Sequence, residues 1–275
     1  MGEALGYNAG VPSPRRPKLG QHFLTTKSYR QRIVQALPLQ ADDLVVEIGP
    51  GRGAMTELLA QRARAVVAVE LDGLLAKALA QTLQPSARIE IIHADILSTD
   101  LAALCRGREV GQCFVFGNLP YYITSPIIHH LVSYAAVIRA MALLVQREVA
   151  ARIVAQPGSR EYGYLSVLAQ FYSKPRLAFV VPPGAFSPPP KVQSALVNFQ
   201  TRLKFSDWAA DDPAHFLEFV KRCFAQKRKN LLNNLMASFP RTRIIQALDS
   251  QDLPPSVRAE EMAVDQLADL WRGLV

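Results

Sequence analysis

Residues Asn118, Leu119, Pro120 and Tyr121 bring together hydrogen-bond acceptors, a fixed turn and an aromatic ring. The exocyclic amine of adenine is a poor nucleophile because its lone pair is delocalised into the ring. The amide oxygen of Asn118 and the carbonyl oxygen of Leu119 can each accept one hydrogen of such an amine, and Pro120 fixes the turn that aims them. Two such bonds favour a pyramidal nitrogen with an available lone pair, and Tyr121 offers a face for an unstacked base. These four are therefore candidate catalytic residues.

A glycine-rich segment, Glu47–Gly53, ends one expected strand and opens the next helix. Glycines at such a turn, here Gly49 and Gly51, let a ligand approach the backbone, and the start of the helix favours a negative group. The spacing also fits the G-x-G-x-x-A pattern of dinucleotide-binding enzymes through Ala54. The loop therefore predicts a nucleotide-like cofactor without choosing between classes, and a tight turn without a ligand is the other interpretation.

Two carboxylates follow later strands. Glu70 lies nineteen residues after Gly51, where an acid can accept both ribose hydroxyls of a nucleoside cofactor. Asp95 can accept the exocyclic amine of an adenine, although such an acid is also a common turn or capping residue. Dehydrogenases and methyltransferases share the ribose-binding acid. The dehydrogenase interpretation is disfavoured because it leaves residues 118–121 without a task.

These side chains need a scaffold of alternating strands and helices. Short apolar strands are expected over 44–48, 65–70, 88–92, 112–116 and 140–145, and helices over 28–36, 55–62, 73–83 and 126–134. This alternation predicts a doubly wound parallel α/β sheet covered on both faces. Two later strands, over 177–181 and 192–199, are expected to pair antiparallel at the sheet edge. Residues 182–190 between them are too rich in proline and glycine for a tight hairpin.

The chain has 275 residues, of which 49% are hydrophobic and 20% charged, and a net charge of +8. The composition is globular, and the basic surplus favours a polyanionic partner. Residues 1–19 read as a flexible basic arm, and residues 205–275 as a small domain with helices over 214–225, 228–239, 242–248 and 264–274. A basic run without acidic residues favours RNA phosphate contacts over a merely solvated face; it comprises Lys221, Arg222, Lys227, Arg228, Lys229, Arg241 and Arg243.

Several classes of protein are disfavoured. No apolar run approaches the roughly 18 residues of a membrane helix, and the N-terminus lacks the pattern of a secretory signal. The three cysteines are an odd number without C-x-x-C spacing, which argues against a disulfide framework or a cysteine zinc site and suits a reducing compartment. We therefore expect a cytoplasmic protein without a metal or a membrane partner, and a monomer.

Several motifs together resemble the S-adenosylmethionine-dependent ribosomal RNA adenine N6-dimethyltransferases, in particular the bacterial small-subunit (16S) type of the kasugamycin-sensitivity family. The resemblance implies a Rossmann-like methyltransferase domain over residues 20–204 and a small helical RNA-binding domain over 205–275. It covers residues 20 to about 200, in the family's order, and is carried by Gly20–Leu24, Val46–Gly53, Val69–Asp72, His93–Leu97, Asn118–Tyr121, Val145–Arg152 and Phe186–Ser194.

The resemblance also implies residue roles, with S-adenosylmethionine as the cofactor. His22 and Leu24 would close over the methionine end, and Asn118 would touch both the cofactor and the target. Phe186 would stack on the target base opposite Tyr121. Tyr122 departs from the family, where a small polar residue is common. The remaining implied contacts are Gly49 and Gly51 lining the cofactor loop, Glu47 supporting it, Glu70 on the ribose and Asp95 on the adenine amine.

The implied activity is methylation of two adjacent adenosines in a hairpin near the 3′ end of 16S rRNA. Two alternatives stay open on the sequence. One is the macrolide-resistance type, which methylates large-subunit RNA. The other is a ribosome-assembly factor whose main role is binding. The motifs permit a second methylation without requiring it.

Overall fold

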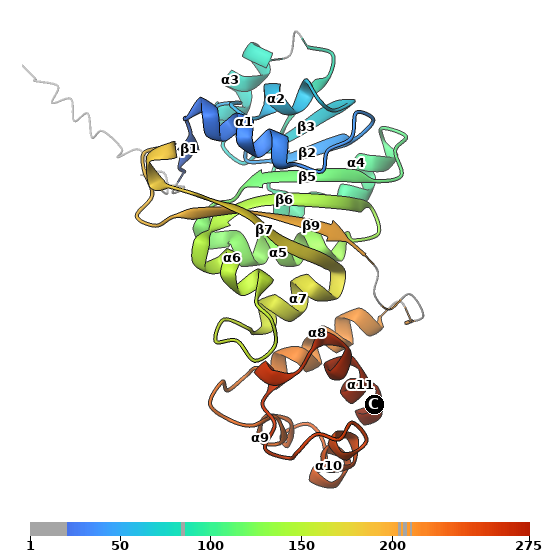
Figure 1. Cartoon of the computed structure of the whole chain (residues 1–275). Coiled ribbons are helices and arrows are strands. Elements are labelled where there is room, and N and C mark those ends of the chain that lie inside the picture. Colours follow the sequence, from blue (N-terminus) through green and yellow to red (C-terminus); the bar gives the residue numbers. More distant parts are fainter. Residues whose placement is uncertain (1–20, 84–85, 203–204, 206–207, 210) are drawn as a thin grey trace, which may run out of the picture.

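A seven-stranded sheet forms the centre of the larger of two units in the computed structural model (Figure 1). The structure describes residues 21–83, 86–202, 205, 208–209 and 211–275. The basic arm expected over residues 1–19 lies outside the described residues. The strand order is β4-β3-β2-β5-β6-β9-β7. Their bounds are β2 Leu44–Ile48, β3 Ala65–Glu70, β4 Ile89–His93, β5 Cys113–Asn118, β6 Ile138–Gln146, β7 Ser173–Val181 and β9 Ser194–Thr201.

The pairing confirms the expected α/β sheet. Strands β4, β3, β2, β5 and β6 are parallel, and β9 pairs antiparallel with both β6 and β7. Strand β2 lies between β3 and β5, so the chain leaves its carboxyl end in one direction and returns on the other side. Such a switch point opens a crevice at the carboxyl ends of the strands, where ligands bind in open α/β sheets. A two-stranded sheet, β1 Phe23–Leu24 with β8 Phe186–Ser187, was not expected from the sequence.

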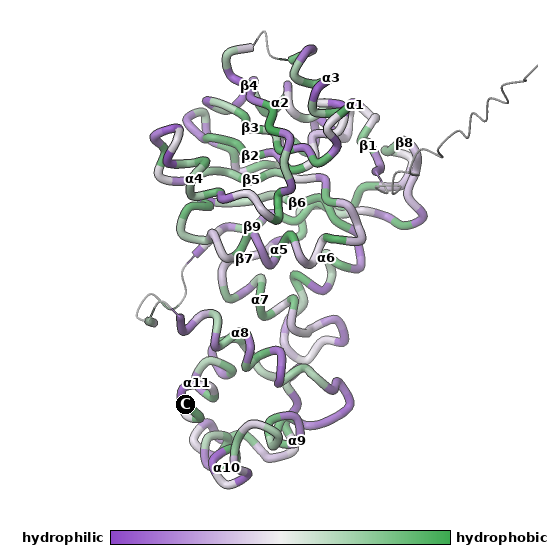
Figure 2. Tube along the Cα trace, turned by 180° about the vertical axis from the view of Figure 1, so that it is seen from behind, coloured by the Kyte–Doolittle hydropathy of each residue, from purple (hydrophilic) through white to green (hydrophobic). Residues whose placement is uncertain are grey.

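Helices cover both faces of the sheet, and alternate residues of each strand face different cores. In β2, Val46 packs with the core under α4, α5, α6 and α7, whereas Val45 packs with the core under α1, α2 and α3. In Figure 2 the central strands are largely hydrophobic, and hydrophilic residues gather in the connecting loops. The bounds are α1 Lys27–Ala36, α2 Thr56–Ala60, α3 Gly73–Leu83, α4 Leu101–Arg106, α5 Thr124–Ser133, α6 Arg147–Val154 and α7 Tyr164–Tyr172. The sequence patterns predicted neither α4, α6 nor α7.

The smaller unit consists of α8 Asp212–Cys223, α9 Leu231–Leu235, α10 Arg241–Asp249 and α11 Val264–Leu274. The helix expected over 228–239 is wrong in extent, since α9 has only five residues. Its start is set by Asn230, whose side chain accepts a hydrogen bond from the Asn233 amide at 3.0 Å. Asn230 also has extended backbone angles, which prevent an earlier start.

The two units share one continuous hydrophobic core. Phe216 of α8 packs on Phe171 of α7 with ring centroids 5.0 Å apart, and Trp271 of α11 lies 4.9 Å from Trp208. A backbone hydrogen bond of 2.7 Å runs from Gly158, in the α6–α7 connection, to the carbonyl of Glu260. The domain boundary near residue 205 therefore stays a prediction from the sequence pattern, while the side chains on either side of it pack together.

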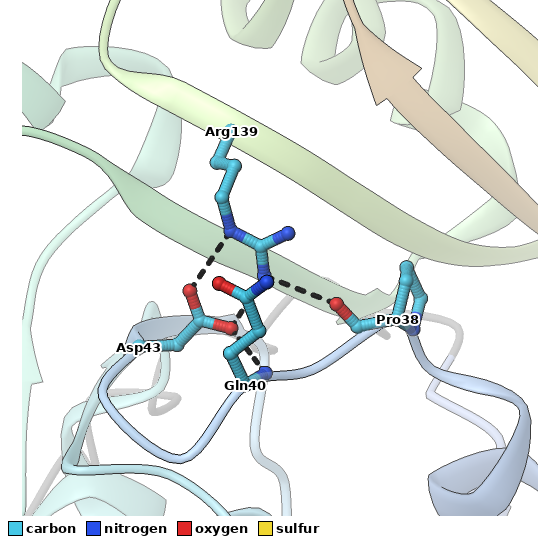
Figure 3. A network of polar contacts seen from close by, with 4 residues as sticks. All are labelled: Pro38, Gln40, Asp43 and Arg139. Atoms are coloured by element: carbon cyan, nitrogen blue, oxygen red, sulfur yellow. Dashed lines mark hydrogen bonds and ion pairs between the residues drawn. The ribbon is translucent and has the colours of Figure 1, made fainter.

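Arg139, which interrupts the apolar run of β6, forms a polar network at the base of the sheet (Figure 3). Its Nε and Nη2 donate to the two carboxylate oxygens of Asp43 at 3.0 and 2.5 Å, and Nη2 also reaches the Pro38 carbonyl at 3.0 Å. Asp43 additionally accepts from the Gln40 amide at 2.6 Å. The network ties the start of β6 to the segment that enters β2, and it satisfies a buried carboxylate. In the described part of the chain, no helix is long and apolar enough to cross a membrane.

Candidate active site

A pocket opens at the carboxyl ends of β2, β3, β4 and β5, at the switch point of the sheet. Segments far apart in sequence meet there because parallel strands end at the same edge. Most of the residues singled out from the sequence line this pocket, namely His22, Gly49, Gly51, Glu70, Asp95, Asn118, Leu119, Pro120 and Tyr121.

The glycine loop after β2 leaves room for a ligand. Gly49 and Gly51 have φ angles of +64° and +59°, a backbone region that favours glycine. A Cβ atom on Gly49 would meet nothing within 4 Å, so the space in front of it is open. A Cβ on Gly51 would lie 2.8 Å from the Phe23 ring. The first glycine therefore borders open space, and the second permits close packing of Phe23.

The carboxylate of Glu70 is held in a fixed orientation at the end of β3. Its Oε2 accepts from the Gly51 amide at 3.1 Å and its Oε1 from the Asp72 amide at 2.9 Å. Burial raises the pKa of Glu70, while these backbone donors oppose the rise. A buried carboxylate that keeps unused lone pairs beside a pocket is suited to accept hydroxyl groups.

Glu47 lies beneath the glycine loop and does not line the pocket. Its side chain is only 2% exposed, and Oε2 has no hydrogen-bond partner among the described residues. The pKa of Glu47 is raised to about 7, chiefly by burial, with the neighbouring Thr56 hydroxyl lowering it and the nearby charge of Glu70 adding to the rise. Glu47 is therefore buried and does not line the pocket, and its role in supporting the loop stays a prediction.

Asn118 ends β5 with its amide group oriented by a distant backbone group. Its Nδ2 donates to the carbonyl of His22 at 2.9 Å, which leaves Oδ1 as the acceptor of this amide. The following turn is anchored: the Leu119 amide donates to the Leu144 carbonyl at 3.0 Å, and the Thr124 hydroxyl donates to the Pro120 carbonyl at 3.1 Å. The arrangement presents an amide oxygen beside a rigid turn.

Tyr121 forms part of the pocket wall, and both its hydroxyl and its ring contact other side chains. The hydroxyl shares a hydrogen bond of 2.6 Å with Ser194, and the ring stacks on the His22 imidazole with centroids 5.6 Å apart. The imidazole Nδ1 donates to the Pro188 carbonyl at 2.7 Å. Burial raises the pKa of Tyr121, and the hydrogen bond to Ser194 opposes the rise. Tyr122 also lines the pocket and is 60% exposed.

Asp95 has both a structural contact and a place in the pocket. Its Oδ1 accepts from the Leu97 amide at 2.9 Å and caps the 3₁₀ turn Ile96–Ser98. The capping interpretation of the sequence is thus correct, and it does not compete with ligand binding, because Oδ2 is the oxygen left for a ligand.

Phe186 does not lie where the resemblance implied, beside the target base. Its ring is 4% exposed and packs in the core under α1, α2 and α3, together with Leu24 and Val181. The pairing of β1 with β8 sets Leu24 opposite Phe186, which draws both side chains inward. Neither residue lines the pocket, so the structure does not bring Phe186 to a position opposite Tyr121, nor Leu24 to the ligand side.

The sequence interpretation missed several pocket contacts. Phe23, Leu71, Ile96 and Ile127 supply apolar walls. Their signal was present in part, since Phe23, Leu71 and Ile96 lie inside the motifs. Ser194 was also inside a motif, but only the fold brings it to Tyr121.

The predicted RNA-binding residues lie on α8 and in the loop after it, all of them exposed: Lys221, Arg222, Lys227, Arg228 and Lys229. Lys221 pairs with Glu218, one turn earlier, and the Lys227 ammonium donates to the Arg160 carbonyl at 2.9 Å. Arg222, Arg228 and Lys229 form no ion pair with another described residue. Among the described residues, no cluster of three His, Cys, Asp or Glu could hold a metal ion.

Comparison with known proteins finds similar sequences over nearly the whole chain. A sequence model of the family described as ribosomal RNA adenine dimethylase matches residues 13–274. The ribosomal RNA small subunit methyltransferase A of Acidobacterium capsulatum is 45% identical over 267 residues, covering 97% of this chain and 93% of that protein. The protein of the same name from Ligilactobacillus salivarius is 40% identical and covers 94% of this chain and 90% of its own.

Two solved structures share the fold over most of the chain. The 23S rRNA methyltransferase ErmE has a TM-score of 0.71 and 27% identity, covering 92% of this chain and 99% of its own. A dimethyladenosine transferase from Plasmodium falciparum has a TM-score of 0.76 and 23% identity, covering 90% and 96%. Both similarities include the region of α8 to α11 as well as the sheet, since each covers nine tenths of the chain.

Proposed function

The chain belongs to the ribosomal RNA adenine dimethylase family, and from this premise we propose that it methylates N6 of two adjacent adenosines in a hairpin near the 3′ end of 16S rRNA. Its methyl donor would be S-adenosylmethionine, and its partner the small ribosomal subunit. The methyltransferase fold and the family imply dependence on this cofactor. We place the enzyme in the cytoplasm, where ribosomal subunits are assembled, and propose that it acts as a monomer.

The observation that carries the proposal is the orientation of Asn118. Its amide nitrogen is engaged by the His22 carbonyl, so its oxygen is the group available at the pocket. An amide oxygen and the neighbouring Leu119 carbonyl form the pair of acceptors that an exocyclic amine requires. Tyr121 supplies an aromatic wall next to them. This pair of acceptors beside an aromatic ring suits an amino group on a flat heterocycle.

The pocket also fits S-adenosylmethionine by the chemistry of its residues. The cofactor carries an ammonium group, a ribose diol, an adenine amine and a cationic sulfonium, all of which call for acceptors or negative charge. The fixed carboxylate of Glu70 would hold the ribose, Asp95 the adenine amine, and the open space at Gly49 would admit the methionine end. When bound, the cofactor supplies an electrophilic methyl group.

The residues of the chain contribute orientation rather than strong acid–base catalysis. Asn118 Oδ1 and the Leu119 carbonyl accept the amine hydrogens, and Tyr121 holds the base plane, so that the amine nitrogen faces the methyl group. Asn118 is neutral and is not a base. None is needed before attack, because the methylated amine becomes acidic and releases its proton to water. A second methylation requires that one of the two amine hydrogen bonds be given up.

RNA would also contact the smaller unit. Arg222, Arg228 and Lys229 are exposed and free of ion pairs with the described residues, so their charge is available to phosphates. Lys221 and Lys227 would contribute less, since each already interacts within the protein.

A second candidate is methylation of large-subunit RNA, which the likeness to ErmE favours. The small-subunit assignment is preferred because the relatives named small subunit methyltransferase A are 45% and 40% identical, against 27% for ErmE.

The test is methyl transfer from labelled S-adenosylmethionine to unmodified small subunits, large subunits and naked rRNA in parallel, with nucleoside mass spectrometry of the products. N6,N6-dimethyladenosine confined to small-subunit RNA is the expected result. Label only in large-subunit RNA would favour the second candidate. Tight subunit binding without any label would indicate an assembly factor.

A further inference from the structure

Ser194 lies outside the pocket, yet its hydroxyl reaches the catalytic turn. It is the first residue of β9, is 0% exposed, and its Oγ lies 2.6 Å from the hydroxyl oxygen of Tyr121. Two strands hold it in place, because β9 pairs Ser194 with Gln146 of β6 on one side and with Val181 of β7 on the other. Ser194 is therefore a fixed point within the sheet.

The backbone of Tyr121 belongs to the anchored turn, and its carbonyl lies 3.5 Å from the Thr124 hydroxyl, but these contacts do not fix its side chain. Tyr121 starts the short 3₁₀ turn Tyr121–Ile123, after β5 has ended, so no strand ladder restrains it. The orientation of its ring depends on two side-chain contacts, the hydrogen bond to Ser194 and the stack on His22. The hydrogen bond is the directional one of the two, since stacked rings slide with little cost.

We propose that Ser194 is a positioning residue, whose hydroxyl holds the Tyr121 ring in the plane that receives the target base. This inference rests on the proposed function, because it assumes that a base enters beside Tyr121. Ser194 does not contact the pocket and is not a catalytic residue.

The hydrogen bond makes the two residues interdependent. Removing either hydroxyl leaves the other in a partly buried site without the partner that it has here, which costs more than removing both. Ser194→Ala frees the hydroxyl end of the ring to shift, and Tyr121→Phe frees it in the same way while preserving the aromatic face. The two substitutions should therefore have effects that do not add.

The experiment compares Ser194→Ala, Tyr121→Phe and the double variant with the wild type. Each single substitution is expected to lower kcat/KM for the RNA about three- to tenfold. The kcat/KM of the double variant should be no lower than that of the less active single variant. Affinity for S-adenosylmethionine should be unchanged in Ser194→Ala. A target RNA with 2-aminopurine at the methylated position keeps the flat purine ring but lacks the 6-amino group, so it reports stacking apart from the amine contacts. Its fluorescence quenching on binding should weaken in both single variants.

Ser173→Ala is the matched control. Ser173 is also a buried serine on this pair of strands, and its hydroxyl donates to the Ala169 carbonyl at 2.6 Å, away from the pocket. Like Ser194→Ala, the Ser173→Ala variant loses a buried serine hydrogen bond, so the melting temperatures of the two variants should change by similar amounts. The kcat/KM and the fluorescence quenching of Ser173→Ala should stay at wild-type values.

The outcomes separate this inference from the proposed function. If the wild type transfers methyl groups to rRNA but the effects of the single variants multiply in the double variant, or if Ser194→Ala behaves like Ser173→Ala, the positioning role is overturned and the function stands. A wild type that methylates no adenine N6 would overturn both.

Discussion

The side-chain amide of Asn118 donates to the backbone carbonyl of His22 at 2.9 Å, across 96 residues of sequence. The bond joins the end of β5 to the segment that precedes β1 and decides which end of the amide is left for a substrate. His22 also stacks on Tyr121, so one residue from the start of the described chain contacts two residues of the turn over 118–121. The geometry of the turn is thus completed by a segment outside the sheet.

We expect Asn118→Ala to abolish methyl transfer, with a loss of at least about a hundredfold in kcat, because the oriented amide oxygen disappears. Affinity for S-adenosylmethionine should fall only modestly, since Glu70 and the glycine loop remain. Single-turnover kinetics and calorimetric titration of the cofactor measure the two quantities separately. An equal loss of both would contradict the role assigned to Asn118.

The buried position of Phe186 leads to a different expectation. Phe186→Ala should lower the free energy of unfolding by about 3–5 kcal/mol, because it leaves a cavity in the core beside Leu24. Phe186→Leu preserves most of the packing and should retain methyl transfer close to the wild-type rate. Urea unfolding and the rRNA assay check the two statements. A well-folded Phe186→Leu protein that had lost RNA methylation would show that the ring reaches the substrate after all.

Glu47 makes stability depend on pH. Its pKa in the folded protein is about 7, above the ordinary value of 4.5, so between these values the folded state holds a proton that the unfolded state has released. The stabilisation is fully present below pH 4.5, declines as the pH rises toward 7 and is absent above it. Glu47→Gln should remove this slope and gain on the wild type by up to about 3 kcal/mol at pH 8.

Urea unfolding of the wild type and Glu47→Gln at several pH values between 5 and 8 measures the effect. Glu57→Gln, which alters an exposed carboxyl on α2, is the control and should leave the slope unchanged. If the free energy of unfolding changed with pH equally in the wild type and in Glu47→Gln, the Glu47 carboxyl would not be the source of the pH dependence.

The salt dependence of RNA binding tests the basic surface. Replacing Arg228 and Lys229 by alanine should reduce the slope of log K against log salt by about 1.5, since each phosphate contact contributes roughly 0.7–0.9. Arg64 and Arg88 are exposed residues directly before β3 and β4, at the amino ends of the strands and therefore away from the pocket, and they form the control pair. An equal change from both pairs would assign the slope to net charge rather than to this surface.

Local patterns were sufficient for the parallel part of the sheet. Apolar runs such as Leu44–Ile48 and the glycines that follow them report burial and turning at the place where they occur. Since the carboxyl ends of parallel strands share one edge, Glu70, Asp95 and Asn118, which all follow such strands, line one pocket. The sequence patterns missed α4, α6 and α7. They also overextended α9, because the start of that helix depends on the capping contact of Asn230.

The sequence by itself determined the class of fold, the pocket edge and the family, because strand burial, glycine loops and motif order are properties of short segments. Only the tertiary structure decided the fate of Phe186, which the pairing of β1 with β8 turns into the core, and the partners of Asn118 and Tyr121. Those partners, His22 and Ser194, come from segments 96 and 73 residues away. Side-chain direction and long-range hydrogen bonds are set by how the finished elements pack, and no local pattern encodes them.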